Sequence, residues 1–259
     1  MQLKQAIIGI GSRILRFIGI IAIIYVSMVF YLALSERRNA FPRAITHKEA
    51  EEAIKETAQK LTCTLSDGSI LHGFSIGAED NPTLLYYPGA DEDAAQFLAE
   101  VEAIEGIHLV TFNYRGSANN KGTPSEDTFE PDAKEIAECA TQAGKNELKY
   151  IAGRGTGAIL AAEQFKGNQT LILIDPVSSI ADALATKYRV LYPKFLIRSK
   201  VCMPYKPLNT AQGQIKILFD RKMASDAAHN VSNKLPFATK FERNGTSLKE
   251  ILVKSIQKN

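Results

Sequence analysis

The feature that most constrains the fold is a regular alternation of short apolar runs with amphipathic stretches from residue 83 onward. The runs TLLYY, HLVTF, LKYIA and TLILI are nearly continuous in apolar character, which is typical of strands buried on both faces of a parallel sheet. Stretches of helical periodicity separate them, over about 91–104, over 131–143 and from 156. The alternation predicts an α/β domain with helices on both faces of a mostly parallel sheet.

The flanking segments extend this pattern to eight strands. Upstream, LTCTL and ILHGFSI surround an Asp-Gly turn at 67–68 and predict an antiparallel hairpin. Downstream, a less regular, partly helical insertion spans about 177–208. It precedes the strand QIKILFD, a helix near 224–234, the strand FATKFER and a terminal helix capped near Ser247.

The N-terminus carries an apolar appendage. Residues 17–34 form a run of 18 residues without a charge, roughly 27 Å of α-helix, which is enough to cross a bilayer. A cleaved signal peptide is the alternative, because Ala33-Leu34-Ser35 has small residues at cleavage-like spacing, but the run exceeds the roughly 7 to 15 residues usual there. We therefore expect a short basic segment over 1–16, an uncleaved single-pass anchor over 17–34, a linker and amphipathic helix over 35–60, and a globular domain over 61–259.

A helix is expected within the linker. Thr46 and Glu49 have the spacing of a capping box, and the charged, amphipathic stretch that follows reaches about Gln59. This helix would join the anchor to the domain.

Charge distribution bears on partners. Residues 1–43 carry six basic side chains and one acidic side chain, a net +5, so the chain total of +3 leaves −2 for the rest. That balance argues against a nucleic-acid-binding face, whereas the basic flank of the apolar run favours contact with the anionic headgroups of a lipid bilayer. Basic residues stand on both sides of the run, so the side of the membrane that holds the domain is not determined.

The three cysteines point to no metal or disulfide framework. Cys63, Cys139 and Cys202 show neither CxxC nor Cys/His spacing and are odd in number. We expect buried free thiols, no metal site and no cofactor.

The segment from about Leu61 to Glu126 resembles a known family. Its Asp-Gly hairpin, its strand ending in YYPGAD and above all FNYRGSANNKGTPSE are similar to the membrane-anchored α/β-hydrolases of the Bem46 type, whose corresponding loop reads YRGxGxSxGxPSE. The similarity extends weakly through Ile180. It implies an α/β-hydrolase fold with an eight-stranded sheet, and an ancestral serine-hydrolase chemistry.

In such enzymes the nucleophilic serine occupies a tight turn between the fifth strand and the next helix. Here that turn reads Gly153-Arg154-Gly155-Thr156-Gly157, and Gly155 stands at the nucleophile position. Gly153 and Gly157 match the glycines that let strand and helix pack closely. Thr156 is the nearest hydroxyl, and we expect it to be an ordinary residue at the start of the helix rather than a nucleophile.

The acid and base positions also lack catalytic side chains. The resemblance places Met223 where the acid should follow the seventh strand. Asp220 and Asp226 lie nearby, and we expect them to serve in a turn and at a helix N-terminus. The family's Gly-His pair after the eighth strand reads Gly245-Thr246, so Thr246 takes the place of the base.

Every histidine of the chain lies elsewhere in the predicted fold: His47 in the linker helix, His72 in the hairpin, His108 at a strand start and His229 in a surface helix. We expect all four to be structural or solvated. The positions of the nucleophile, the acid and the base all lack catalytic side chains, so we expect no conventional Ser-His-Asp catalysis.

The oxyanion side of the site is retained in part. Gly89 and Ala90 follow the third strand and Thr156 opens a helix, so their backbone amides are candidates to hold a ligand. The main hypothesis is therefore a pseudohydrolase that binds a small molecule, a lipid or a protein through the old cleft or the insertion.

Two alternatives stay open. Gly153, Gly155 and Ala158 fit the GxGxxG/A pattern of dinucleotide-binding proteins, with Asp175 about 20 residues on. In the other alternative, the chain is an active ester or acyl hydrolase that uses displaced groups.

The groups considered for such displaced catalysis are Asp175, Ser178 and Ser179. For the two serines, we expect instead that they cap the first helix of the insertion.

Overall fold

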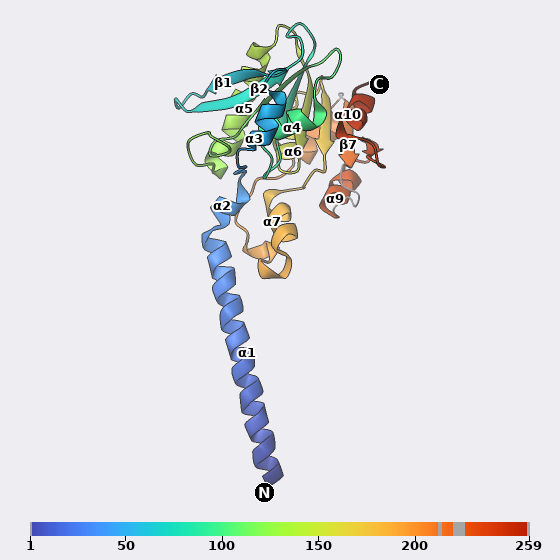
Figure 1. The fold of residues 1–259 in the computed structure, drawn as a ribbon. Helices are drawn as coiled ribbons and strands as arrows, with labels where there is room; N and C mark the ends of the chain where they lie inside the picture. The colour runs from blue at the N-terminus through green and yellow to red at the C-terminus, as the bar shows by residue number, and fades with distance from the viewer. Residues whose placement is uncertain (1, 212–213, 220–225, 258–259) are drawn as a thin grey trace.

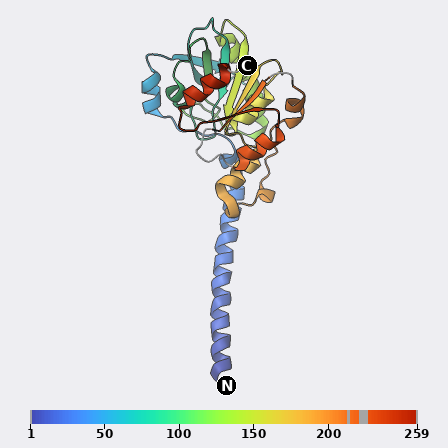
Figure 2. The same cartoon turned by 90° about the vertical axis from the view of Figure 1, so that its right-hand side faces the viewer.

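The computed structural model describes residues 2–211, 214–219 and 226–257, in which one long N-terminal helix projects from an α/β domain (Figures 1 and 2). The strands are β1 Gln59–Thr64, β2 Ile70–Ile76, β3 Thr83–Tyr87, β4 His108–Phe112, β5 Leu148–Arg154, β6 Thr170–Ile174, β7 Gln214–Phe219 and β8 Thr239–Glu242. The α-helices are α1 Gln2–Leu34, α2 Glu36–Ala40, α3 Lys48–Ile54, α4 Ala94–Val101, α5 Glu126–Ala143, α6 Gly157–Glu163, α7 Ile180–Tyr188, α8 Tyr205–Thr210, α9 Asp226–Lys234 and α10 Leu248–Gln257. Two 3₁₀ turns, η1 Arg189–Leu191 and η2 Lys194–Leu196, lie in the predicted insertion.

The eight strands form one sheet in the order β1-β2-β4-β3-β5-β6-β7-β8. Only the β1–β2 and β2–β4 pairs are antiparallel, and the other five pairs are parallel. The predicted hairpin and mostly parallel sheet are therefore confirmed. The register pairs Tyr87 of β3 with Gly153 of β5 and Arg154 of β5 with Ile174 of β6, which brings the carboxyl ends of the three central strands together.

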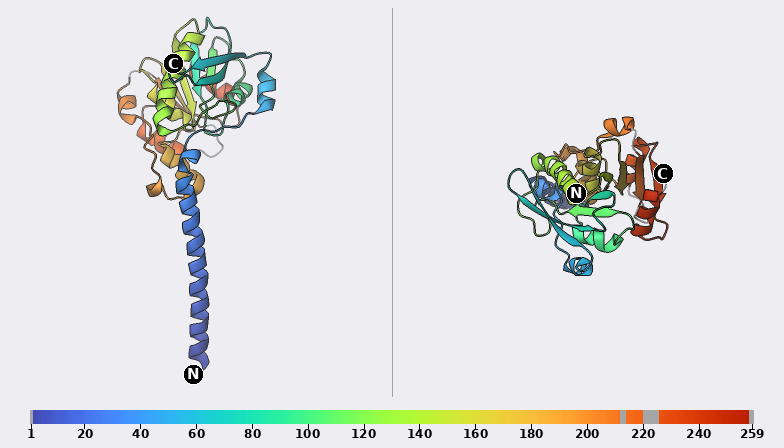
Figure 3. Two further views of the ribbon diagram at one scale, coloured as in Figure 1. Left: turned by 90° about the vertical axis from the view of Figure 1, so that its left-hand side faces the viewer. Right: turned by 90° about the horizontal axis from the view of Figure 1, so that it is seen from above.

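Helices cover both faces of the sheet, as the alternation predicts (Figure 3). One face packs against α3, α4 and α10, and the other against α5, α6 and α9. Neighbouring side chains of β3 contact the helices on opposite faces, since successive residues of a strand point in opposite directions. Tyr86 stacks on Phe97 of α4 with ring centroids 3.4 Å apart, whereas the Tyr87 hydroxyl donates to the Ala133 carbonyl of α5 at 2.7 Å.

Helix α1 is longer than the predicted anchor. Within the described residues, its segment Gly9–Leu34 is long and apolar enough to cross a membrane, with 26 residues and a mean hydropathy of 2.5. Most of its apolar side chains are exposed on the surface of the protein.

The linker after α1 is packed onto the domain. Phe41 is buried and meets the Phe129 ring edge-on at 5.4 Å. The Ser117 hydroxyl donates to the Pro42 carbonyl at 3.1 Å and accepts the Ala44 amide at 3.3 Å. The loop that carries the family resemblance therefore fixes the chain that follows helix α1.

Arg115 of the same loop ties three segments together. Its guanidinium donates to both Asp132 oxygens of α5, at 2.9 and 2.8 Å, in the bidentate geometry of strong ion pairs. It also donates to Asp67 at 2.8 Å and Ser69 at 2.7 Å in the hairpin turn. The Arg115 hydrogen bond, aided by Ser69, lowers the pKa of Asp67 from 3.8 to about 2.

The predicted linker helix is partly wrong. Helix α3 begins after His47 and ends at Ile54, and no side chain caps it. The Asp93 carboxylate, from the loop before α4, instead accepts the His47 amide at 2.7 Å. A partner from another part of the chain thus replaces the local capping box expected from Thr46 and Glu49.

Two other helix boundaries differ from prediction. Helix α4 starts later than residue 91, because Asp93 forms its capping box with Gln96. Helix α5 starts earlier than Pro131, because Ser125 and Thr128 form a capping box one turn upstream. Pro131 lies inside α5, beyond its first turn, so it removes one intrahelical hydrogen bond but does not set the boundary.

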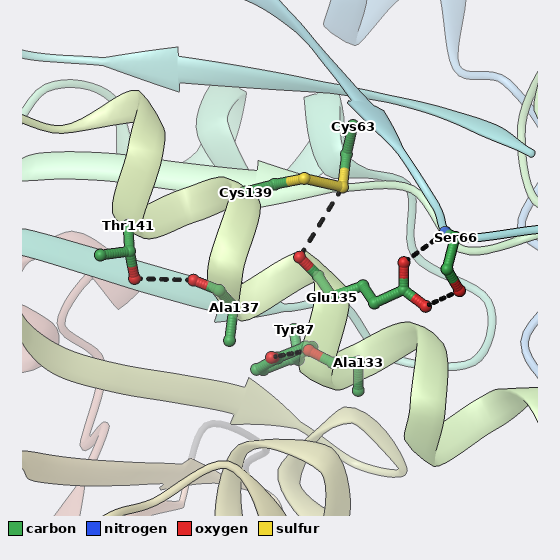
Figure 4. Close-up of a disulfide and its surroundings, with 8 residues drawn as sticks. All are labelled: Cys63, Ser66, Tyr87, Ala133, Glu135, Ala137, Cys139 and Thr141. Atoms are coloured by element: carbon green, nitrogen blue, oxygen red, sulfur yellow. Dashed lines mark hydrogen bonds between the residues drawn. A yellow bond between two sulfur atoms is a disulfide. The ribbon is translucent and has the colours of Figure 1, made fainter. Parts of the chain in front are cut away.

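The expectation of three free thiols is wrong. Cys63 of β1 and Cys139 of α5 form a disulfide with a Cα–Cα distance of 5.7 Å, while Cys202 is free and exposed (Figure 4). Glu135 of α5 makes a second link to the hairpin, because its carboxylate accepts hydrogen bonds from the Ser66 amide at 2.6 Å and the Ser66 hydroxyl at 2.8 Å. The two cysteines are 76 residues apart, and only the packing of α5 on the hairpin brings them together.

Candidate functional site

The turn between β5 and α6 keeps the backbone of a nucleophile elbow. Gly155 has φ +56°, a left-handed conformation that favours glycine. Its amide donates to the Ile174 carbonyl at 3.0 Å, which anchors the turn to β6. A Cβ atom placed on Gly155 would meet no heavy atom within 4 Å. The elbow therefore presents an open position without a side chain to attack a substrate.

The glycines on either side are required by close backbone contacts. A Cβ on Gly153 would lie 2.3 Å from the Gly157 carbonyl oxygen. A Cβ on Gly157 would lie 2.3 Å from the Tyr87 carbonyl oxygen and 2.4 Å from the Pro88 carbonyl oxygen. The start of α6 is thus pressed against the loop that follows β3, which is the arrangement that sets an oxyanion site beside an elbow.

The backbone amides of the three predicted oxyanion-side residues differ in whether they already donate a hydrogen bond within the protein. The Gly89 amide already donates to the Glu92 carboxylate at 2.9 Å. Within the described chain, the amides of Ala90 and Thr156 donate no hydrogen bond. The Thr156 hydroxyl is buried, with the residue 4% exposed, and it has no partner among the described atoms. Thr156 is the N-cap of α6 but makes no capping bond with its side chain.

Beside the elbow lies a charged cluster that the sequence did not indicate. Arg154 donates to Glu92 at 2.6 Å and to Glu100 at 3.3 Å. The second Glu92 oxygen accepts the Tyr86 hydroxyl at 2.5 Å, and burial, with the negative charge of Glu92, raises the pKa of Tyr86. The cluster joins the loop after β3 to the end of β5. In the sequence, the position of Arg154 at the end of a buried strand could have indicated such a cluster, because a charge in that position requires a partner.

The predicted base position, Thr246, carries a hydroxyl and no titratable group. Thr246 is exposed in the loop between β8 and α10, and its hydroxyl donates to the Arg243 carbonyl at 2.8 Å. On the acid side, Met223 and Asp220 lie outside the described residues. Asp226 is the exposed first residue of α9, as predicted for a helix N-terminus.

The four histidines are spread over the domain. His47 contacts Asp93 through Nδ1 at 3.2 Å, and His72 is exposed on β2. His108 is buried at the amino end of β4, away from the carboxyl ends where the elbow lies, and burial lowers its pKa. His229 is exposed on α9, with its ring 5.2 Å from that of Phe219 at the end of β7, two strands from β5.

The groups considered for displaced catalysis have structural contacts. Ser179 caps α7 by accepting the Asp182 amide at 3.0 Å, as predicted. Ser178 is not a cap, because its hydroxyl pairs with that of Tyr205 at 2.9 Å. Asp175 is buried at the end of β6 with φ +41°, and its amide donates to the Leu218 carbonyl at 2.9 Å.

Two hollows lie elsewhere on the domain. One, of about 460 Å³, lies where α2 meets the start of α5 and is lined by residues that include Glu36, Phe41 and Ser199. The other, of about 570 Å³, lies between α10 and the turn before β4. Among the described residues, no cluster of three or more His, Cys, Asp or Glu side chains is arranged to hold a metal ion.

Comparison with solved structures decides the fold. An alpha-beta hydrolase from Vibrio vulnificus superposes with a TM-score of 0.64 at 17% identity, covering 86% of this chain and 88% of its own. An esterase from Pyrococcus furiosus gives 0.59 at 13% identity, with 84% and 93% covered. A proline iminopeptidase-related protein from Thermus thermophilus gives 0.57 at 15% identity, with 77% and 97% covered. This chain has the α/β-hydrolase fold.

At these identities the likeness extends to the fold and not to the activity. No family model matches the sequence, and no curated protein does so significantly. In the α/β-hydrolase strand order, the Gly-x-Gly strand is β5, near the middle of the chain, whereas a dinucleotide-binding sheet begins with that strand. In this fold the close contact of β5 with α6 requires Gly153 and the left-handed turn favours Gly155, so the pattern has a structural explanation.

Proposed function

We propose that this chain is a membrane-anchored pseudohydrolase, which binds a ligand or partner at the carboxyl edge of its sheet without forming an acyl-enzyme. Gly155 carries the proposal, because the elbow keeps its left-handed turn and its open position but lacks a nucleophile. The absence of a histidine after β8 supports it, since a serine-type nucleophile also needs a base. Kinship with the Bem46-type hydrolases is part of this proposal and rests on the loop from Tyr114 to Glu126.

The anchor is the second part of the proposal. The exposed apolar face of Gly9–Leu34 supports a transmembrane helix. The hydrogen bonds of Tyr25 with Val190 and of Arg198 with Ala33 support retention of that helix in the mature protein. The Cys63–Cys139 disulfide favours an oxidising compartment for the domain, because thiols in the cytosol are kept reduced. The domain would then lie on the non-cytosolic side.

Activity profiling of the full chain in detergent tests the missing chemistry. We expect no labelling by a fluorophosphonate probe and no turnover of short acyl esters. Gly155→Ser is the matched variant, since a serine Cβ meets no neighbouring atom there, and it too should turn over no ester because no histidine occupies the base position. Robust labelling of the wild-type chain would overturn the proposal, and loss of that labelling in Thr156→Ala would locate the nucleophile.

A further inference from the structure

The insertion after β6 lies against the membrane-spanning helix. The Tyr25 hydroxyl of α1 donates to the Val190 carbonyl of η1 at 2.9 Å. Tyr25 is nine residues before the end of α1 at Leu34, roughly 14 Å along the helix axis. Figures 1 and 2 both show the insertion beside the upper part of α1. Any bilayer that surrounds the apolar segment of α1 up to its end would therefore reach η1.

Polar contacts fix the insertion to the end of the anchor. Glu36 is buried, and its carboxylate accepts the Tyr192 hydroxyl at 2.7 Å and the backbone amides of Arg198 and Ser199 at 2.7 and 3.0 Å. The Arg198 guanidinium also donates to the Ala33 carbonyl at 2.8 Å. The insertion and the end of α1 thus form one connected unit.

The part of the insertion nearest α1 exposes large apolar side chains. Phe195 is 84% exposed and Val190 77% exposed, and Leu191 and Leu196 are exposed in part, at 40% and 37%. Exposed apolar patches of this kind mark a contact surface, and this one continues the apolar surface of α1.

Part of the backbone of this segment has hydrogen-bond partners within the protein. The Leu196 amide donates to the Pro193 carbonyl at 3.0 Å, and the Ile197 amide donates to the Lys194 carbonyl at 3.1 Å. Tyr25 satisfies the Val190 carbonyl. Irregular backbone near a bilayer is tolerated where its polar groups have partners.

Cationic side chains border the apolar patch. Lys187, Arg189, Lys194 and Arg198 are all exposed. Lys194 pairs with Asp182 and Arg198 with Glu36, so some of this charge is shared with carboxylates. Long basic side chains at the border of an apolar surface extend toward lipid phosphates.

We propose that the segment from Arg189 to Ile197 is a second membrane contact, in which Val190 and Phe195 enter the acyl region of the leaflet next to the domain. This inference rests on the proposed anchor, since α1 defines where the bilayer lies. The insertion leaves the carboxyl end of β6, next to β5, so the contact brings the edge of the sheet that carries the elbow close to membrane-borne molecules.

The chain contains no tryptophan, so each Phe→Trp variant carries a single reporter. The full chain would be reconstituted into phosphatidylcholine vesicles whose acyl chains are brominated either near the headgroup or near the chain end, because bromine quenches tryptophan at contact. Phe195→Trp is the test variant, with Val190→Trp as a second reporter should the first fail to fold. Phe17→Trp reports on the anchor, and Phe237→Trp, exposed just before β8 at the amino end of the sheet, is the matched soluble control.

We expect brominated acyl chains to quench Phe195→Trp at least twofold, to quench Phe17→Trp from at least one of the two bromine positions, and to leave Phe237→Trp unquenched. Quenching of Phe17→Trp without quenching at Phe195 or Val190 would overturn the second contact and leave the anchor intact. No quenching of Phe17→Trp would overturn the anchor and the second contact together. Equal quenching of Phe237→Trp and Phe195→Trp would also overturn the inference, because the contact would not be specific to the insertion.

Discussion

Removal of the disulfide between β1 and α5 should destabilise the domain strongly. The bond closes a loop of 76 residues, and the loss of that constraint on the unfolded chain corresponds to about 4.5 kcal/mol at 25 °C in the chain-entropy treatment. For a domain of this size each kcal/mol shifts the melting temperature by roughly 2–4 °C. The double variant Cys63→Ser/Cys139→Ser should therefore melt about 9–18 °C below the wild-type chain.

Circular dichroism melts of the full chain in detergent measure the effect. The wild-type chain treated with reductant should melt close to the double variant, because both lack the same cross-link. Cys202→Ser is the matched control, and it should melt with the wild-type chain because Cys202 is free and exposed.

Thiol titration provides the refutation. The unreduced chain should show one reactive thiol per molecule under denaturing conditions, that of Cys202, and three after reduction. Three thiols without reduction, or a melting temperature that reductant leaves unchanged, would refute both the cross-link and the oxidising compartment inferred from it.

Three further variants test the elbow and the charge network. Gly157→Ala should lower the free energy of unfolding by at least about 3 kcal/mol, because its Cβ meets fixed backbone oxygens. Gly155→Ala should lower it by only about 1–2 kcal/mol, because the residue has a left-handed φ. Urea denaturation of both variants measures these losses, and equal losses would contradict the close contact at Gly157. The pKa of Asp67 is lowered from 3.8 to about 2, mainly by Arg115, so its contribution to stability is fully present above about pH 4 and is lost as the pH falls through 2. Asp67→Asn should therefore lower the urea midpoint at pH 6, and the difference from the wild-type chain should narrow toward pH 2; a constant difference would show that Asp67 acts through packing and not through its charge.

The central elements of the fold were predictable because their determinants are local. The apolar character of β3 to β6 indicates strands buried on both faces, and each is observed. Glycines at 153, 155 and 157 indicated a tight turn between strand and helix, and the structure shows the contacts that require two of them.

Other features depend on partners distant in sequence. The expected linker helix ends earlier because Gln59 pairs with Ser75 in the hairpin, and Asp93 pairs with the His47 amide at its start. Arg154 forms ion pairs with Glu92 and Glu100 of the α4 region, so the Gly89 amide faces a carboxylate rather than an open site. No pattern in the sequence specifies these pairings, because they arise when the loop after β3 packs against the end of β5.

The sequence by itself determined the order of strands and helices, the apolar N-terminal helix and the lack of a serine at Gly155, because periodicity and residue identity are properties of neighbouring positions. The tertiary structure alone decided that Cys63 meets Cys139 and that Val190 of the insertion meets Tyr25 of the anchor. Each of these contacts joins segments more than 70 residues apart. Their formation depends on how the helices pack around the sheet, which no local pattern encodes.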